Sequence, residues 1–277
     1  MDELTRKALL RNVQDALAED IGNRDWTSEL VDHSAAACAV LTVREPAVLC
    51  GRPWFDETLT QVDSRLRVEW RTEEGSFMRA GDTVCEISGP ARSLLTAERT
   101  ALNFLQLLSG VASATDALVQ IVAGTGARVL DTRKTLPGLR LAQKYAVRIG
   151  GGSNHRLGLF DAILIKENHI QAKGGIAAVL HAATNLNAGV PVQVEVESLD
   201  ELADALAVGA RSILLDNFTL TQMGEAVKLN EGRAELEVSG GVSESTLRAI
   251  AETGVDRISV GGLTKNVRAI DFSLRFV

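Results

Sequence analysis

Aromatic residues and basic charge are scarce in this 277-residue chain. It contains 7 Phe, 3 Trp and 1 Tyr, and its formal net charge is −7, since 36 acidic residues outnumber 29 basic ones. A protein that binds nucleic acid needs a basic face to neutralise phosphates and usually aromatic rings on which bases stack. We therefore expect no nucleic-acid partner.

Cysteines and long apolar runs are also few. The three cysteines, Cys38, Cys50 and Cys85, form no CxxC pair and no even-numbered disulfide framework. The first 22 residues mix acids with bases and lack the apolar core of a signal peptide. No uninterrupted apolar run approaches the roughly 20 residues of a membrane span. These absences predict a cytoplasmic protein with reduced thiols and no membrane partner.

The N-terminal part of the chain predicts an α+β arrangement. The first segment has the pattern of an amphipathic helix with Leu4, Leu10, Val13 and Leu17 facing inward. Residues 35–90 are rich in strand-forming runs separated by Pro and Gly, which break regular structure.

A second helical pattern follows the Gly89-Pro90 break. Its apolar side is long, and its other side carries a polar stripe of Arg99, Asn103 and Gln106. Residues spaced in this way lie on one face of a helix. An otherwise apolar helix with such a stripe has a polar task on that face.

From residue 127 onward, short β-branched runs alternate with helical patterns. The six runs are 127–131, 161–166, 192–198, 212–217, 235–241 and 257–262. This alternation predicts a parallel sheet. Polar or glycine residues stand at the C-terminal ends of the runs, where the catalytic rim of a closed βα barrel lies, and no GxGxxG follows the first run. We therefore predict a barrel preceded by an α+β domain.

The chain also contains a basic island, residues 128–173, with nine Lys or Arg against three acids. Arg133 and Lys134 follow the first run, His155 and Arg156 follow a glycine-rich turn, and Lys166 ends the second run. Guanidinium groups bind carboxylates or phosphates through paired N–H bonds, and a lysine adds a mobile point charge. The island predicts a pocket for a small ligand with two or more anionic groups.

Acidic side chains on the later runs complement this island. Alternation along the third run places Gln193, Glu195 and Glu197 on one face, and Asp216 ends the fourth run. Acids inside a barrel are costly unless they bind a metal, sugar hydroxyls or a cation, or pair with the basic residues. The carboxylates are too far apart in sequence for a metal motif, so we expect any Mg²⁺ to be held jointly with a polyphosphate ligand.

Glycines end the last two runs, at Ser239-Gly240-Gly241 and Gly261-Gly262. Glycine lets backbone N–H groups approach a phosphate closely, and the last two strands of a βα barrel are the usual phosphate site. The two pairs together predict a phosphate cradle.

Taken together, these motifs resemble the quinolinate phosphoribosyltransferase family, and the resemblance runs nearly from end to end. The motifs appear in this order along the chain: LLTAERTALNFLQLLSG, DTRKT, PGLR, GGGSNHRLGL, VEVES, LLDNF, VSGGV and SVGGLTK. The resemblance implies an α/β protein with an N-terminal α+β open sandwich domain (1–110) followed by an irregular TIM-like α/β barrel (111–265). Residues 266–277 are expected to pack back on the first domain.

The resemblance also implies roles for individual residues. Thr132, Arg133, Lys134, His155, Arg156 and Lys166 surround the quinolinate carboxylates, and Glu195 and Asp216 lie near the ribose and Mg²⁺. The backbone holds phosphate at Ser239, Gly240, Gly241, Val260, Gly261 and Gly262. Lys134, Lys166, Glu195 and Asp216 are the expected catalytic residues. Arg99 is expected to reach the active site of the other subunit in a homodimer, with higher oligomers left open. Lys265 stands where some members carry His, so no proton-transfer role is expected there.

The activity that the resemblance implies is phosphoribosyl transfer from phosphoribosyl pyrophosphate to quinolinate with Mg²⁺. Decarboxylation accompanies the transfer, and the products are nicotinate mononucleotide, pyrophosphate and CO2. Three alternatives stay open: a paralogue of the molybdenum-utilisation ModD type with another acceptor, a Schiff-base aldolase with Lys166 as nucleophile, and a non-catalytic phosphosugar-binding barrel.

Overall fold

The computed structural model describes residues 1–277, which divide into two compact units. Unit 1 contains Met1–Asp116, Thr135–Gly151 and Gly262–Val277, and unit 2 contains Ala117–Lys134 and Gly152–Gly261. The division into 1–110 and 111–265 follows chain order, whereas the compact units do not. The difference arises because two later segments pack with the N-terminal residues.

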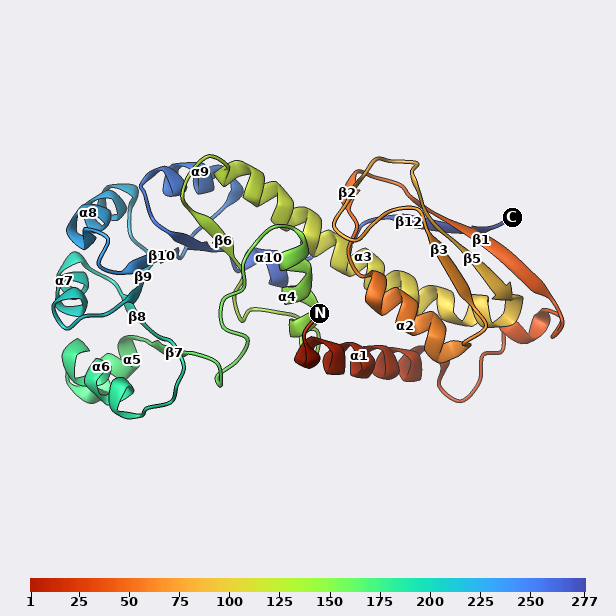
Figure 1. The fold of residues 1–277 in the computed structure, drawn as a ribbon, viewed down its shortest axis with the longest axis horizontal. Coiled ribbons are helices and arrows are strands. Elements are labelled where there is room, and N and C mark those ends of the chain that lie inside the picture. Colours follow the sequence, from red (N-terminus) through yellow and green to blue (C-terminus); the bar gives the residue numbers. More distant parts are fainter. The chain divides into compact units, whose positions relative to one another are not determined.

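Unit 1 is built on an antiparallel sheet in the order β12-β1-β5-β3 (Figure 1). The sheet strands are β1 (Ala36–Val43), β3 (Arg67–Trp70), β5 (Thr83–Pro90) and β12 (Phe272–Phe276); the short pair β2 (Ala47–Val48) and β4 (Phe77–Met78) lies apart. The last strand pairs with the first, Leu41 opposite Leu274. The chain's C-terminal segment therefore completes the N-terminal sheet.

The helices of unit 1 bury their apolar sides in two clusters. They are α1 (Glu3–Ile21), α2 (Arg52–Val62), α4 (Arg140–Ile149), α10 (Gly262–Lys265), a short 3-10 turn (Ser28–Leu30) and most of α3 (Ala91–Val122). One cluster lies on the sheet and includes Leu41, Ile87, Leu94 and Phe272. The other joins Val13, Trp54, Leu108 and Val147. Burial of these side chains explains why α4, which follows the basic DTRK stretch, belongs to unit 1.

The inward face of α1 differs from the one expected. Its buried residues are Thr5, Leu9, Val13 and Leu17, whereas Leu4 and Leu10 are 44% and 42% exposed. Residues four apart lie along one face of a helix, so Thr5 and Leu9 share the buried face of α1 with Val13 and Leu17. The prediction for Leu4 and Leu10 was wrong.

Helix α3 is long and apolar enough to cross a membrane by length and composition. The expectation concerned uninterrupted apolar runs, and α3 is not one, because Glu98, Arg99 and Asp116 interrupt it. In this structure Leu94, Leu105 and Leu108 of α3 lie in the two core clusters, because the helix packs between the sheet and the other helices of unit 1. Burial against protein accounts for the apolar character of α3.

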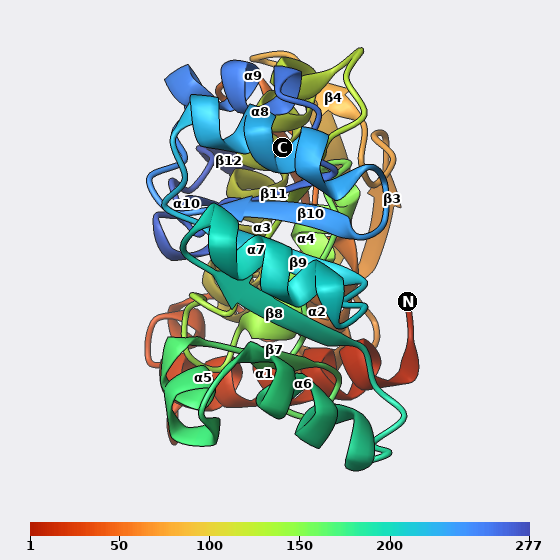
Figure 2. The ribbon, with the colours of Figure 1, turned by 90° about the vertical axis from the view of Figure 1, so that its left-hand side faces the viewer.

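Unit 2 is a six-stranded parallel sheet in the order β6-β11-β10-β9-β8-β7, with helices α5 to α9 lying against it (Figure 2). Its strands are β6 (Arg128–Leu130), β7 (Ile163–Ile165), β8 (Val192–Val196), β9 (Ser212–Asp216), β10 (Glu235–Ser239) and β11 (Arg257–Ser259). Its helices are α5 (Glu167–Lys173), α6 (Ile176–Asn185), α7 (Leu199–Ala207), α8 (Leu220–Asn230) and α9 (Glu244–Glu252). All six runs predicted from the sequence are strands, so the expected α/β class is confirmed.

The parallel sheet has two edge strands, β6 and β7, which are not paired with each other. On its outer side β6 makes one isolated bridge, from Leu130 to Ser153. The irregular barrel is therefore interrupted between β6 and β7, and residues 152–156, at the end of the glycine-rich turn, begin beside β6 on this side, where the Ser153 N–H donates to Val129 O at 2.9 Å.

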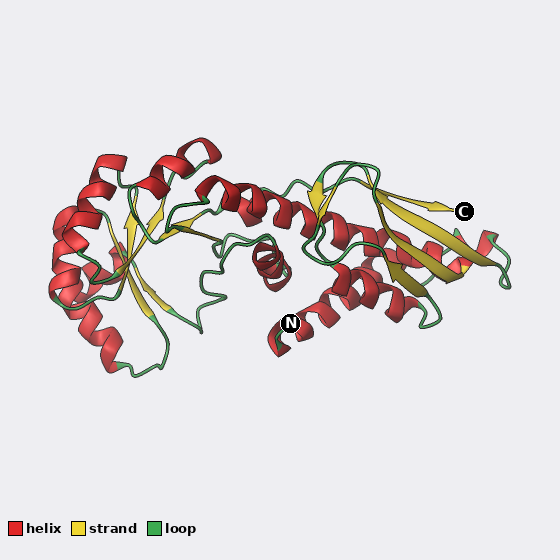
Figure 3. Ribbon diagram, turned by 45° about the horizontal axis from the view of Figure 1, so that its top comes forward, coloured by secondary structure: helices red, strands yellow, loops and turns green.

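The register of the sheet brings the ends of the strands to one edge (Figure 3). Ile165 is opposite Val194, so that Lys166 and Glu195 are neighbours, and Ser239 is opposite Asp216. Ser259 is opposite Leu130, which places residues 131 and 260 side by side. Residues far apart in the sequence thus meet at the C-terminal edge, as the barrel prediction requires.

Candidate active site

The glycine-rich turn is attached to β6 by a buried carboxylate. Asp131 is 0% exposed, and its two oxygens accept hydrogen bonds from Asn154 Nδ2 at 2.6 Å and the His155 backbone N–H at 2.9 Å. The sequence placed Asp131 among the polar rim residues. The structure shows that its carboxylate instead fixes the turn that carries His155 and Arg156.

Two guanidinium groups lie near each other beside this turn. Burial lowers the pKa of Arg156, and the positive charge of Arg133 lowers it further, while Asp161 opposes both effects. Asp161 holds the loop by accepting the backbone N–H groups of Leu157 at 2.7 Å and Gly158 at 2.9 Å. Two like charges held together in a partly buried place are relieved by a bound anion. The binding of an anionic ligand by Arg133 and Arg156 stays a prediction.

The ends of β6 and β11 bring Thr132, Lys134 and Gly261 together. A Cβ atom at Gly261 would lie 3.2 Å from Lys134 Cδ, 3.6 Å from Thr132 Oγ1 and 3.8 Å from Lys134 Nζ. Thr132 Oγ1 also accepts the backbone N–H of Lys134 at 3.0 Å. The absence of a side chain at Gly261 lets the Lys134 side chain lie directly over the backbone of the glycine pair.

Lys166 and Glu195 form an ion pair at the ends of β7 and β8. Lys166 Nζ lies 2.8 Å from Glu195 Oε1 and 2.7 Å from Oε2. The Glu195 side chain is 8% exposed and that of Lys166 is 44% exposed. The salt bridge considered from the sequence is therefore present, with the carboxylate buried and the ammonium group accessible to a ligand.

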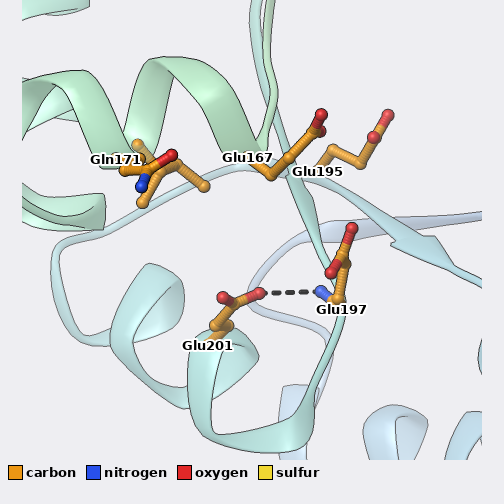
Figure 4. Close-up of a pocket in the computed structure, with 6 residues that line it drawn as sticks. Glu167, Gln171, Glu195, Glu197 and Glu201 are labelled. Carbon is orange, nitrogen blue, oxygen red and sulfur yellow. Dashed lines mark hydrogen bonds between the residues drawn. The ribbon is translucent and has the colours of Figure 1, made fainter.

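An acidic pocket of about 280 Å³ adjoins Glu195 (Figure 4). Glu167, Glu197 and Glu201 line it from α5, the end of β8 and α7. The Glu197 backbone N–H donates to Glu201 at 2.7 Å, which leaves the side chain of Glu197 directed toward those of Glu195 and Glu167 (Figure 4). Cationic and acidic side chains therefore lie close together at the C-terminal edge of the unit 2 sheet. This arrangement suits an anionic ligand that binds together with a metal cation.

Asp216 is held by two donors. Ser239 Oγ donates to one carboxylate oxygen at 2.7 Å and Asn217 Nδ2 to the other at 2.8 Å. Asn217 has a positive φ of 56°, and its side chain occupies the space beside Gly240, where a Cβ would lie 2.2 Å from Asn217 Oδ1. A Cβ at Gly241 would meet nothing within 4 Å, so that backbone is open to a ligand. Asp216 and Ser239 are thus joined by a hydrogen bond, and their contacts with ribose and phosphate stay predictions.

Sequence reasoning missed a buried polar network inside the sheet. Glu237 of β10 is 0% exposed, and its carboxylate accepts hydrogen bonds from Gln193 Nε2 at 2.9 Å and from Ser259 Oγ. His155 Nε2 lies 3.0 Å from Gln193 Oε1. The signal was available in ELEVS, where Glu235 and Glu237 alternate with apolar residues as Gln193 and Glu195 do in β8.

This network borders a second cavity of about 350 Å³, lined in part by His155, Arg156, Gln193 and Arg257. Arg257 reaches toward Glu237, with Nε 3.5 Å from Oε2, and donates from Nη2 to Ser212 Oγ at 2.6 Å. The face of the sheet that contacts His155, in the glycine-rich turn, is therefore polar.

Some predicted site residues belong to unit 1. Arg99 is exposed on α3, and Gly262 and Lys265 lie in α10. Their contact with substrate stays a prediction. Gln143, which the sequence did not single out, is 0% exposed, accepts the Leu136 N–H at 2.8 Å and donates to Thr264 O at 2.8 Å. It ties the segment after DTRK to α10.

A parallel α/β sheet that gathers cationic side chains, carboxylates and open glycine backbone at its C-terminal edge defines an enzyme for small anionic substrates. Family models of quinolinate phosphoribosyl transferase match this chain over residues 25–109, the N-terminal domain, and 111–275, the C-terminal domain. The chain belongs to the quinolinate phosphoribosyltransferase family.

Individual relatives agree with this assignment. The chain is 43% identical over 272 residues to the nicotinate-nucleotide pyrophosphorylase (carboxylating) of Mycobacterium leprae, with 95% of each chain covered. It is 37% identical to quinolinate phosphoribosyltransferase (decarboxylating) 1b of Nicotiana tabacum, covering 95% of this chain and 81% of that one. The solved structure of nicotinate-nucleotide pyrophosphorylase from Francisella tularensis superposes with a TM-score of 0.96 at 45% identity, covering 100% of both chains.

Proposed function

We propose that this protein transfers the phosphoribosyl group of phosphoribosyl pyrophosphate to quinolinate and decarboxylates the product to nicotinate mononucleotide, a step of de novo NAD biosynthesis. The observation that carries the proposal is the ion pair of Lys166 with the buried Glu195, which leaves the ammonium group accessible; Arg133 and Arg156, whose positive charges act on each other, supply further cations in unit 2. A pyridine dicarboxylate offers two carboxylates to these cations, and paired N–H bonds orient its ring.

The reaction needs the ring nitrogen to face C1 of the sugar as pyrophosphate departs. In this proposal Lys134, which lies beside Gly261, neutralises charge on the leaving group, and the backbone at Gly240 and Gly241 holds phosphate. The carboxylates of Glu195 and Asp216 stabilise positive charge that develops on the ribose. Once the ring nitrogen carries the sugar, it draws electrons from the adjacent carboxylate, which leaves as CO2, and the ring carbon takes a proton.

Mg²⁺ fits this set of residues only with help from the substrate. No group of three or more potential ligands is assembled in the structure, and both oxygens of Asp216 already accept hydrogen bonds. Mg²⁺ commonly keeps its waters and binds through one or two carboxylates and substrate phosphates. Glu195 and Asp216 are the residues that would hold it, and the ion would neutralise charge on the pyrophosphate.

The decisive experiment incubates the protein with quinolinate, phosphoribosyl pyrophosphate and Mg²⁺ and follows CO2 and pyrophosphate together. We expect both in equal amounts, with nicotinate a poor acceptor because it lacks the second carboxylate. Equal turnover of nicotinate would contradict the substrate assignment. Pyrophosphate release only with another acceptor would favour the paralogue, binding without turnover would favour a phosphosugar-binding barrel, and borohydride trapping of a carbonyl substrate on Lys166 would favour an aldolase.

The working form that we propose is a cytoplasmic homodimer in which Arg99 serves the neighbouring subunit. Arg99 and Asn103 are exposed on α3 in line along one face, and an exposed cation on a largely apolar helix suits contact with an anionic substrate across an interface. Mixing Arg99→Ala with Lys134→Ala chains should restore activity, since one site of each mixed dimer is then intact. The double variant mixed with either single variant should restore none. Restoration by the double variant, or none in well-mixed single variants, would contradict the donation of Arg99.

A further inference from the structure

A chain of hydrogen bonds crosses the interior of unit 2 from β10 to the cationic turn. Glu237 accepts from Gln193 Nε2 at 2.9 Å, Gln193 Oε1 lies 3.0 Å from His155 Nε2, and His155 Nδ1 accepts the backbone N–H of Arg156 at 2.7 Å. Two strands, β10 and β8, and the turn therefore share one relay. Its first member is fully buried and its last carries a guanidinium of the proposed site.

The carboxylate of Glu237 determines which group donates and which accepts at each step of the relay. An ionised carboxylate only accepts hydrogen bonds, whereas an amide can present either its NH2 group or its oxygen. Because Glu237 accepts, Gln193 turns its NH2 group toward Glu237 and its oxygen toward His155. His155 then carries its proton on Nε2, which leaves the Nδ1 lone pair for the Arg156 N–H. A proton on Nδ1 would remove that last bond.

Glu237 Oε1 also lies 3.4 Å from His155 Nε2, but Gln193 Oε1, at 3.0 Å, is the nearer acceptor. We propose that Glu237 is a positioning residue that fixes the Nε2–H tautomer of His155 through Gln193, and thereby holds Arg156 for the ligand carboxylate. The part of this inference that concerns the ligand rests on the proposed function, whereas the tautomer is a property of the free protein. Glu237 touches no substrate in this account.

The contacts around the relay support a positioning role. Asp131 anchors the same turn from the opposite side through the His155 N–H at 2.9 Å, so the backbone of His155 and the ring of His155 are held independently. Ser259 Oγ donates to the second oxygen of Glu237, and Arg257 lies 3.5 Å away, so the buried charge is compensated. The backbone N–H of Arg156 is thus held by the His155 ring, and its guanidinium donates from Nη1 to Ala162 O at 3.3 Å.

The test is the tautomer of His155 in the free protein. The chain has four histidines, so the imidazole nitrogens in 15N-labelled histidine can be assigned by comparison with His155→Asn. Above the imidazole titration range, we expect a pure Nε2–H signature for the unaltered chain and a mixture of tautomers in Glu237→Gln. The amide introduced by Glu237→Gln can donate as well as accept hydrogen bonds, so it no longer fixes the orientation of the Gln193 amide. A pure Nε2–H form in Glu237→Gln would overturn the proposal.

Glu235→Gln is the matched control. It makes the same chemical change two residues earlier on β10, where Glu235 pairs with Arg128 and Arg257 and takes no part in the relay. We expect its His155 tautomer to be unchanged. A mixture of tautomers in Glu235→Gln as well would show that loss of a carboxylate from β10 in general, rather than the relay, is responsible, and would overturn the proposal.

Ligand binding provides the second readout. Glu237→Gln should weaken binding of pyridine-2,3-dicarboxylate by about tenfold and raise its KM, because one oriented charged contact is worth about that factor. Binding of inorganic pyrophosphate, which uses other groups, should be unchanged. If the dicarboxylate does not bind to the unaltered chain, the proposed function fails while the tautomer result still stands.

If Glu237→Gln does not fold, Gln193→Met interrupts the relay while keeping the carboxylate. The same mixture of His155 tautomers is then expected, with the far-ultraviolet circular dichroism of the unaltered chain as the check on folding. A single Nε2–H form in a folded Gln193→Met protein would likewise overturn the proposal.

Discussion

Lys166 and Glu195 form a two-pronged ion pair, with Nζ 2.8 Å and 2.7 Å from the two carboxylate oxygens. The pair unites the ends of adjacent strands, and the carboxylate is almost buried while the ammonium group is accessible. The same two side chains thus have a structural task and, in the proposed reaction, a chemical one.

These two tasks can be separated by a double-mutant cycle. Lys166→Met leaves the Glu195 carboxylate without its cation, so it should be more destabilising than Glu195→Gln. The double variant should recover about 1 kcal/mol of the lost stability. Activity should stay lost in both variants that lack Lys166, since the ligand there lacks its cation. Urea unfolding and turnover are the measurements, and recovery of activity in the double variant would contradict the chemical role of Lys166.

Lys134 is expected to act on the substrate rather than on the fold. Its side chain lies over Gly261 at the end of the sheet, and we expect Lys134→Ala to lower kcat/KM at least about tenfold with unchanged thermal stability. Lys173→Ala, at the exposed end of α5, is the control and should retain full activity. Unchanged turnover in Lys134→Ala would remove Lys134 from the site.

Gly261→Ala tests the same contact from the other side. The new methyl group would lie 3.2 Å from Lys134 Cδ, which is close enough to displace a flexible side chain without disturbing the backbone. We expect a folded protein whose activity falls toward that of Lys134→Ala. Combining the two substitutions should cost little more than Lys134→Ala alone, because they remove the same contact, whereas additive losses would indicate independent roles.

Gly240 and Gly241 should respond differently to alanine. A Cβ at Gly240 would meet Asn217 Oδ1 at 2.2 Å and would displace the side chain that donates to Asp216. At Gly241 no atom lies within 4 Å, so alanine there costs only the strain of a positive φ, about 1 kcal/mol. We expect Gly240→Ala to lose stability and activity and Gly241→Ala to lose less stability. Equal unfolding midpoints would contradict the steric argument.

Asp56 in unit 1 predicts a pH-dependent change of stability. Burial raises the pKa of Asp56 above its usual value, although the Trp70 Nε1 donor at 2.9 Å opposes the shift. A carboxyl group with a raised folded-state pKa lowers stability as pH rises through the unfolded and then the folded value. Asp56→Asn should therefore raise Tm at neutral pH, and the gain should shrink below about pH 4.

The control for this prediction is Asp204→Asn, an exposed position on α7. It should change Tm little at either pH. A gain in Asp56→Asn that is the same at neutral and acidic pH would show that packing, rather than ionisation of Asp56, produces it.

Much of this protein could be predicted from the sequence, because the relevant signals are local. Alternation of β-branched runs with helical patterns predicted all six strands of the parallel sheet, and the side chains that end those strands meet at one edge because parallel strands all point the same way. The order of motifs likewise indicated the family. Lys134, Lys166, Glu195 and Asp216 could be singled out on this basis.

Tertiary structure alone decided which polar residues face the ligand and which hold the site together. Asp131 has the same strand-end position in sequence as Asp216, yet it is fully buried and accepts hydrogen bonds from the glycine-rich turn. Glu237 looked like one more acid in a strand, but the register places it opposite Arg257 and within reach of Gln193. The pattern and spacing of residues in the sequence determine where the strands form. The hydrogen-bond partners of a buried charge come from other strands, so they are decided only when the strands pack together.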